Sequence, residues 1–119
     1  MTEEQLQAAA FQNIWNTIPE TRGKIRLIHN NPKNKIQGGF LKAMGLQPGI
    51  SDHCMIVSGG MIWLESKLPD GVQSKAQKEF EKMVNELEGH YYYIYRSIEE
   101  FEEIVRKHSQ CLKNQNINQ

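Results

Sequence analysis

The chain has 119 residues, enough for one domain with a single hydrophobic core. Hydrophobic residues make up 39% of it and charged residues 24%, a composition that excludes the disordered and fibrous classes. Basic and acidic side chains number 14 each, so the net charge of zero argues at first against a polyanionic partner.

The first half of the chain opens with a helix. Thr2 fits an N-cap, and apolar residues recur at helical spacing from Leu6 to Ile18, which predicts a helix over residues 3–17. A short strand is expected within residues 24–29. A turn-rich loop then leads into a helix over 35–44, and a second loop, rich in glycine and proline, follows it.

The middle of the chain has the pattern of a β-hairpin. Residues 52–58 and 61–67 are rich in Ile, Val, Met and Trp, and the Gly-Gly pair between them can form a two-residue turn. With that turn, Asp52 pairs with Lys67 and Cys54 pairs with Glu65, so all four side chains project from one face. His53 then faces the other side, where we expect a structural role.

The second half alternates helix, strand and helix. Ser74 opens a capping box for a helix that stops at Gly89, residues 91–95 form an aromatic strand, and Ser97 opens the last helix. Residues 113–119 are a polar tail that we expect to be mobile. The order predicts one α/β domain over residues 1–112, with a mixed central sheet flanked by helices.

Charge is unevenly distributed along these elements. Residues 21–51 carry six basic side chains and no acidic one, whereas residues 79–103 carry eight glutamates against one lysine and one arginine. A local positive potential can attract a polyanion to a protein of zero net charge. From charge alone, a phosphate-binding surface and an ordinary solvated basic stretch are equal alternatives.

Cysteine usage and the N-terminal sequence indicate a compartment. Cys54 and Cys111 lie far apart without metal-type spacing, which favours a reducing environment. The acidic N-terminus is unlike a secretory signal, and no apolar run approaches the roughly 20 residues of a membrane helix. We therefore expect a cytoplasmic protein without a membrane partner, in a bacterial or phage-infected cell.

Two acids and an amine gather on the predicted hairpin face. In the predicted register Asp52 and Glu65 are diagonal neighbours, about 7–8 Å apart at the backbone and within reach of one ion. Two carboxylates suit Mg²⁺ or Mn²⁺, which retain waters and accept phosphate oxygens as further ligands. Lys67 could then activate a water or neutralise charge that develops on a phosphate.

A purely structural interpretation stands beside this one. An Asp–Lys pair across two strands can be a surface ion pair worth less than roughly 1 kcal/mol. A shift of one residue in the turn would also place Asp52 and Glu65 on opposite faces. The spacing therefore predicts a catalytic centre only if the register places both acids on the same face.

Three segments together resemble a known nuclease family. They are residues 45–52 (GLQPGISD), 63–67 (WLESK) and 71–77 (GVQSKAQ). This pattern is similar to the virus-type replication-repair nuclease (VRR-NUC) domain of the restriction-endonuclease-like PD-(D/E)xK superfamily. The resemblance extends from Glu3, Leu6 and Gln7 to the final helix. It departs at Ser51, where the family usually has proline before the aspartate.

The resemblance implies a restriction-endonuclease-like core and a metal centre on the hairpin. Asp52 and Glu65 would bind a divalent cation, Mg²⁺ or Mn²⁺. The Ser66 carbonyl would be an additional ligand, and Lys67 would be the catalytic lysine.

The resemblance also implies a contribution from two helices. Glu3 matches an acid that the N-terminal helix brings to the metal, with Glu4 as the alternative. Gln77 matches a catalytic glutamine that follows the hairpin. Because Gln77 is also the fourth residue of a capping box begun by Ser74, a structural role as a helix cap is an equal alternative.

A polar, basic loop before the second helix is the candidate DNA-binding segment. Its candidate residues are Asn30, Asn31, Lys33, Asn34 and Lys35. Such side chains would contact phosphates and sugars, which positions DNA without reading its sequence. Asparagine-rich loops also form ordinary turns, but the resemblance favours DNA contact.

The function implied by the resemblance is metal-dependent endonuclease cleavage of branched or structured DNA, as in Holliday-junction resolvases of DNA repair. Small stand-alone members of the family are homodimers, and a two-fold dimer suits paired cuts across a four-way junction. Two alternatives are a non-catalytic DNA-binding accessory protein and a restriction-type endonuclease that reads sequence.

Overall fold

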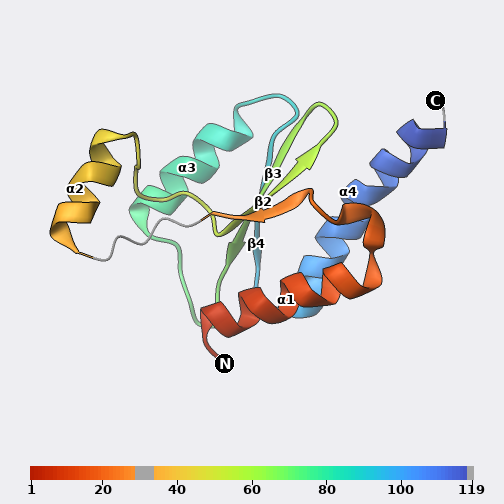
Figure 1. Ribbon diagram of the computed structural model, residues 1–119, viewed down its shortest axis with the longest axis horizontal. Coiled ribbons are helices and arrows are strands. Elements are labelled where there is room, and N and C mark those ends of the chain that lie inside the picture. The colour runs from red at the N-terminus through yellow and green to blue at the C-terminus, as the bar shows by residue number, and fades with distance from the viewer. Residues whose placement is uncertain (29–33, 118–119) are drawn as a thin grey trace.

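A computed structural model describes residues 1–28 and 34–117, with side chains described as far as residue 109 (Figure 1). The elements, in chain order, are α1 (Glu3–Thr17), the 3-10 helix η1 (Pro19–Thr21), β1 (Ile25–Leu27), α2 (Lys35–Ala43), β2 (His53–Val57), β3 (Gly60–Ser66), α3 (Lys75–Asn85), β4 (Tyr91–Tyr95) and α4 (Ile98–Ile117). Each predicted helix and strand has its counterpart here. The last helix continues into the segment that was expected to be a polar tail.

The four strands form one mixed sheet in the order β1-β2-β3-β4. The β1–β2 and β2–β3 pairs are antiparallel, whereas β3 and β4 run parallel. Parallel neighbours need a crossover connection, and α3 supplies it. The predicted α/β class, with a mixed central sheet flanked by helices, is confirmed.

Helices cover both faces of this sheet. Figure 1 shows α3 on one side of the strands and α4 on the other. On the α3 side, the ring of Phe80 meets Trp63 of β3 edge-on at 5.3 Å and Tyr92 of β4 at 6.0 Å between centroids. Side chains alternate along a strand, so the residues next to Trp63 in β3 face the opposite layer.

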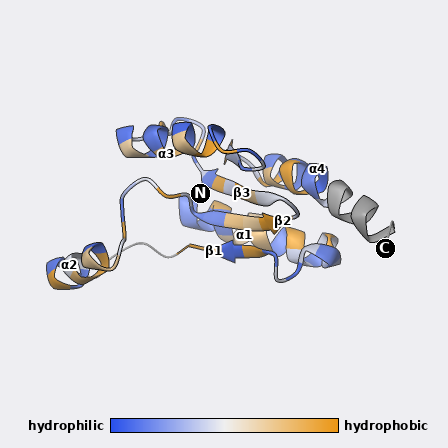
Figure 2. Ribbon diagram, turned by 90° about the horizontal axis from the view of Figure 1, so that it is seen from above, coloured by the Kyte–Doolittle hydropathy of each residue, from blue (hydrophilic) through white to orange (hydrophobic). Residues whose placement is uncertain are grey.

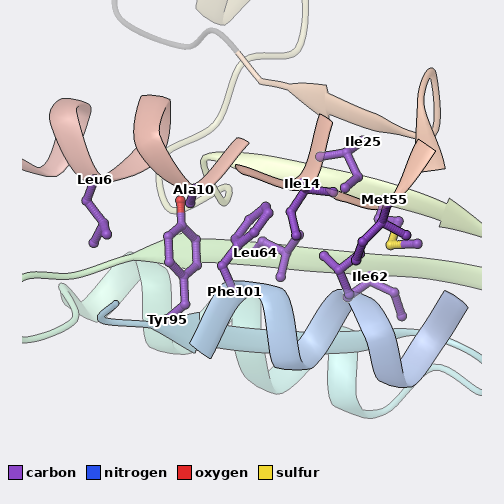
Figure 3. Packing of buried hydrophobic residues seen from close by; sticks show 11 residues of the cluster. Leu6, Ala10, Ile14, Ile25, Met55, Ile62, Leu64, Tyr95 and Phe101 are labelled. Atoms are coloured by element: carbon purple, nitrogen blue, oxygen red, sulfur yellow. The ribbon is translucent and has the colours of Figure 1, made fainter. Parts of the chain in front are cut away.

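The main hydrophobic core lies between the sheet and the pair α1 and α4. Its buried members are Leu6, Ala10, Ile14, Ile18, Ile25, Met55, Ile62, Leu64, Tyr95, Phe101 and Val105. Figure 3 shows the α1 side chains pointing at those of the sheet and α4. The buried Leu6 therefore fixes the first turns of α1 over the sheet. The polar residues next to Leu6 in α1 are positioned near the sheet by the same packing.

The helix α2 contrasts with the others, because none of its residues is buried. Asn34 caps it by accepting a hydrogen bond from the Gln37 backbone at 2.8 Å. Both views show α2 apart from the layered body (Figures 1 and 2). Over the described part of the chain, no helix combines the length and the apolar character needed to cross a lipid bilayer.

The hairpin register differs from the prediction by two residues. The turn consists of Ser58 and Gly59, with a φ of 86° at the glycine, and Val57 pairs with Gly60. The register pairs His53 with Leu64, and its continuation by one residue places Asp52 opposite Glu65. The predicted Asp52–Lys67 and Cys54–Glu65 pairs are therefore wrong. The direction of the side chains repeats every two residues along a strand, so a shift of two leaves Asp52 and Glu65 on the same face, as predicted.

A close backbone contact, and not the turn, explains why the first residue of β3, Gly60, is a glycine. A Cβ atom at Gly60 would overlap the carbonyl of Gly89, and one at Gly89 would overlap the carbonyl of Gly59. The hairpin end and the loop that ends α3 thus meet without room for side chains. This contact is between segments far apart in sequence, and the local Gly-Gly pattern does not reveal it.

We expect Gly60→Ala to destabilise the fold by about 2 kcal/mol or more, because overpacking against backbone cannot be relieved by a rotamer change. Urea unfolding at equilibrium would measure the loss. Gly39→Ala is the matched control, because an added Cβ there has no neighbour within 4 Å. In a helix that replacement should be neutral or stabilising by up to about 1 kcal/mol. Equal stabilities of the two variants would contradict the close contact.

Candidate active site

The carboxyl groups of Asp52 and Glu65 meet at the end of the sheet where β2 begins and β3 finishes. Asp52 immediately precedes β2, and Glu65 is the penultimate residue of β3. Glu65 is buried, with only 2% of its surface exposed. The β2–β3 register, continued by one residue, places Asp52 opposite Glu65, and the charge of Asp52 acts on the Glu65 carboxyl at this short range.

The environment of Glu65 disfavours its ionised form. Burial raises its pKa, and the charge of Asp52 adds to this, so that the pKa reaches about 8 although the nearby Lys67 ammonium lowers it. One carboxyl oxygen, Oε2, is buried and has no hydrogen-bond partner among the described residues. An acid of this kind is costly to ionise unless a cation or a proton accompanies it.

Gln77 contacts the other oxygen of Glu65. Its Nε2 donates to Glu65 Oε1 at 3.0 Å, across from the first turn of α3. Its Oε1 accepts from the Ser74 backbone N–H at 2.8 Å, while the Ser74 hydroxyl accepts from the Gln77 backbone at 3.1 Å. The capping role and the contact with the acidic site were alternatives in the sequence, yet one side chain makes both.

Asp52 is held from the α1 side of the sheet. The Ser66 backbone N–H and the Ser66 hydroxyl both donate to Asp52 Oδ2, each at 2.8 Å. The Ser66 hydroxyl in turn accepts from Gln7 Nε2 of α1 at 2.8 Å. Ser66 was predicted for its carbonyl, and this use of its side chain was missed. Gln7 follows Glu3 by four residues, a spacing that places both on one side of the helix and could have indicated it.

Glu3 lies nearer to this centre than Glu4 does. It is half-buried, and its charge makes a small contribution to the raised pKa of Glu65, whereas Glu4 is exposed. Within the described ranges, however, no three side chains of His, Cys, Asp or Glu come together as a metal-binding group. Glu3 therefore lies near Asp52 and Glu65 but does not form a three-residue metal-binding group with them.

Lys67 is buried beside the acids, with 8% of its surface exposed. Its backbone N–H donates to the Tyr95 carbonyl at 3.0 Å, which extends the parallel pairing of β3 and β4. Arg96 holds the following loop, since its Nη1 donates to the carbonyls of Leu68 at 2.7 Å and Gly71 at 2.9 Å. Sequence reasoning missed Arg96, because its partners are backbone atoms of a distant loop.

The two residues that follow Asp52, His53 and Cys54, lie in surroundings that do not favour a catalytic role. His53 is buried between Phe11, whose ring stacks on it at 6.1 Å, and Phe101, and burial lowers its pKa. This agrees with the structural role expected for it. Cys54 is partly buried, and burial raises the pKa of its thiol, so it is a poor nucleophile.

The predicted DNA-binding segment is described only in part. Asn30, Asn31 and Lys33 lie outside the described residues. Asn34 and Lys35 are exposed at the start of α2, away from the pair of acids. The structure therefore places these two on the surface and does not bring them to the acidic centre.

The residues present fit a hard divalent cation. Two carboxylates in contact, one with a buried oxygen that lacks a partner, are the hard oxygen donors that Mg²⁺ and Mn²⁺ prefer. Such ions keep several waters, so two protein carboxylates can suffice. Either ion would compensate the charge that now raises the pKa of Glu65.

Comparison with known proteins finds similarity among solved structures. No protein-family model and no curated protein matches the chain. A solved structure described as "VRR_NUC domain protein" is similar over 91% of this chain and 88% of its own, with a TM-score of 0.70 and 20% sequence identity. The chain thus has the VRR-NUC fold, a restriction-endonuclease-like α/β fold.

Proposed function

We propose that this protein with the VRR-NUC fold is a divalent-metal-dependent DNA endonuclease. One observation carries the proposal: the buried carboxyl of Glu65 contacts Asp52 and retains an oxygen without a hydrogen-bond partner. Two acids forced together inside a protein are unfavourable for stability, and such pairs are typical of functional sites. The name of the structural neighbour, a VRR_NUC domain protein, supports the coarser part of the proposal, a nuclease domain.

Asp52 and Glu65 would hold Mg²⁺ or Mn²⁺, with the Ser66 carbonyl as a further ligand and Glu3 acting through water. The bound ion would polarise a phosphate and lower the pKa of a water nucleophile. Gln77 fixes Glu65 Oε1, so that Oε2 is the oxygen left for the ion.

Lys67 supplies positive charge inside this centre. Its ammonium lowers the pKa of Glu65, so its charge favours the carboxylate form that an ion would need. In a buried site such a charge can stabilise the negative charge that develops on a phosphate during hydrolysis. Gln77 touches the same acid and would keep it oriented during the reaction.

We propose branched or structured DNA as the substrate, with a homodimer as the acting species. Basic side chains between residues 21 and 51, including Lys35, would provide phosphate contacts. A dimer would suit this substrate, because two copies related by a two-fold axis would present two cutting centres to a four-way junction.

A cleavage panel tests the proposal. The wild-type protein should nick four-way junctions and forks in Mn²⁺ or Mg²⁺, leave linear duplexes nearly intact, and be inactive in EDTA. Denaturing gels of end-labelled strands would map the cuts. Asp52→Asn, prepared in parallel, controls for a contaminating nuclease.

The same panel separates the alternatives. An accessory protein would bind branched DNA in EDTA and leave every strand intact when metal is added. A restriction-type enzyme would cut linear duplexes at a fixed sequence. Either pattern would rule out a structure-specific nuclease.

A further inference from the structure

A chain of hydrogen bonds joins α1 to the acidic centre. Gln7 Nε2 donates to Ser66 Oγ, and Ser66 Oγ donates to Asp52 Oδ2, both at 2.8 Å. Ser66 is fully buried, and Gln7 is half-buried. The partners Gln7 and Ser66 are 59 residues apart in sequence, so the contact exists only in the folded chain.

The chain has a defined direction. A serine hydroxyl has one proton and two lone pairs. Because the Gln7 amide can only donate through Nε2, it occupies a lone pair of Ser66 Oγ and leaves the hydroxyl proton for Asp52. The Ser66 backbone N–H donates to the same oxygen, Oδ2, at 2.8 Å. Two donors on one oxygen fix the carboxyl orientation and leave Oδ1 outside this chain of bonds.

We propose that Gln7 and Ser66 are positioning residues that orient Asp52 for a divalent cation. The inference rests on the metal-dependent function proposed above and deepens it. Partners of metal-binding carboxylates commonly orient them and tune their affinity. If the bond from Gln7 to Ser66 only held α1 against the sheet, Ser66 would not also need to donate to Asp52. Here α1 reaches the acid through a buried hydroxyl with a single proton.

Mn²⁺ affinity, measured by calorimetry without DNA, tests the proposal. Gln7→Met keeps the length and helix propensity of the side chain and removes the donor, and Ser66→Ala removes the hydroxyl. Each should weaken Mn²⁺ binding about tenfold. Gln12→Met is the matched control, because Gln12 lies on the same helix and is exposed. It should bind Mn²⁺ as the wild type does.

The double variant gives a sharper result. If Gln7 acts through the Ser66 hydroxyl, Gln7→Met combined with Ser66→Ala should bind Mn²⁺ about as weakly as Ser66→Ala alone. Independent effects would multiply to about a hundredfold. Thermal melts of the metal-free proteins show whether each variant is folded, and a purely structural role would lower the melting temperature while Mn²⁺ affinity stayed unchanged.

The possible outcomes distinguish this inference from the proposed function. Unchanged affinity in folded Gln7→Met, or multiplicative effects in the double variant, would overturn the positioning role. A wild type that binds Mn²⁺ with the expected variant effects but cleaves no DNA would overturn only the nuclease. A wild type that binds no Mn²⁺ would overturn both.

Discussion

Replacement of Glu65 by glutamine should abolish metal-dependent cleavage while making the metal-free protein more stable at alkaline pH. The amide oxygen of the new side chain can still accept from Gln77, but the group cannot carry the charge that a divalent ion requires. Loss of an essential catalytic group commonly lowers turnover by more than about 10³-fold. Cleavage of a four-way junction in Mn²⁺, followed over time, would measure the loss.

The stability part of this prediction follows from the pKa of Glu65. Folding raises that pKa from 4.5 to about 8. The stabilisation of the protonated form is fully present below pH 4.5 and is lost as pH rises through 8. Above that range the ionised acid opposes folding by on the order of 5 kcal/mol. Glutamine has no such cost.

Thermal melts in EDTA check it. At pH 9 Glu65→Gln should melt higher than the wild type by roughly 5 °C or more, and at pH 5 the two should be close. Glu79→Gln is the control, because Glu79 is exposed on α3. It should change neither cleavage nor the pH dependence. A variant that cuts at the wild-type rate would remove Glu65 from the centre.

Mn²⁺ should bind more tightly as the pH rises towards 8. Since the pKa of Glu65 is about 8 in the metal-free protein, an ion that needs the carboxylate must displace a proton below that pH. The apparent affinity should therefore rise about tenfold per pH unit, or about a hundredfold from pH 6 to 8, and then level off.

Calorimetry in buffers of different ionisation enthalpy would count the released protons. Close to one proton per ion is expected at pH 6.5 and progressively fewer above pH 8. An affinity that does not change between pH 6 and 8, with no proton release, would show that Glu65 does not bind the ion. Asp52→Asn should weaken binding at every pH, because the ion loses a carboxylate.

The sequence was sufficient for the elements and their order. The capping box of Thr2 and the spacing of Leu6, Ala10 and Ile14 predict α1 with its observed bounds. The hairpin register was not predictable in the same way, because Gly60 is required by its contact with Gly89 and not by the turn.

The candidate site shows the same division. Asp52 and Glu65 were expected on one face, and this survived the register error because the error was an even number of residues. The hydrogen bond from Gln7 to Ser66 could not be predicted, because it depends on how α1 docks onto the sheet. Local patterns thus identified the acids, and only the packed structure identifies what orients them.

The two contacts of Gln77 couple the N-terminal cap of α3 to the orientation of the Glu65 carboxyl. The side-chain amide of Gln77 accepts from the Ser74 backbone N–H in the capping box and donates to Glu65 Oε1. When the first turn of α3 frays, the carboxyl loses a neighbour at the same moment as the helix loses its cap. A change that opens the first turn of α3 would therefore also remove a hydrogen bond from Glu65, so the stability of this turn and the orientation of the acid should vary together.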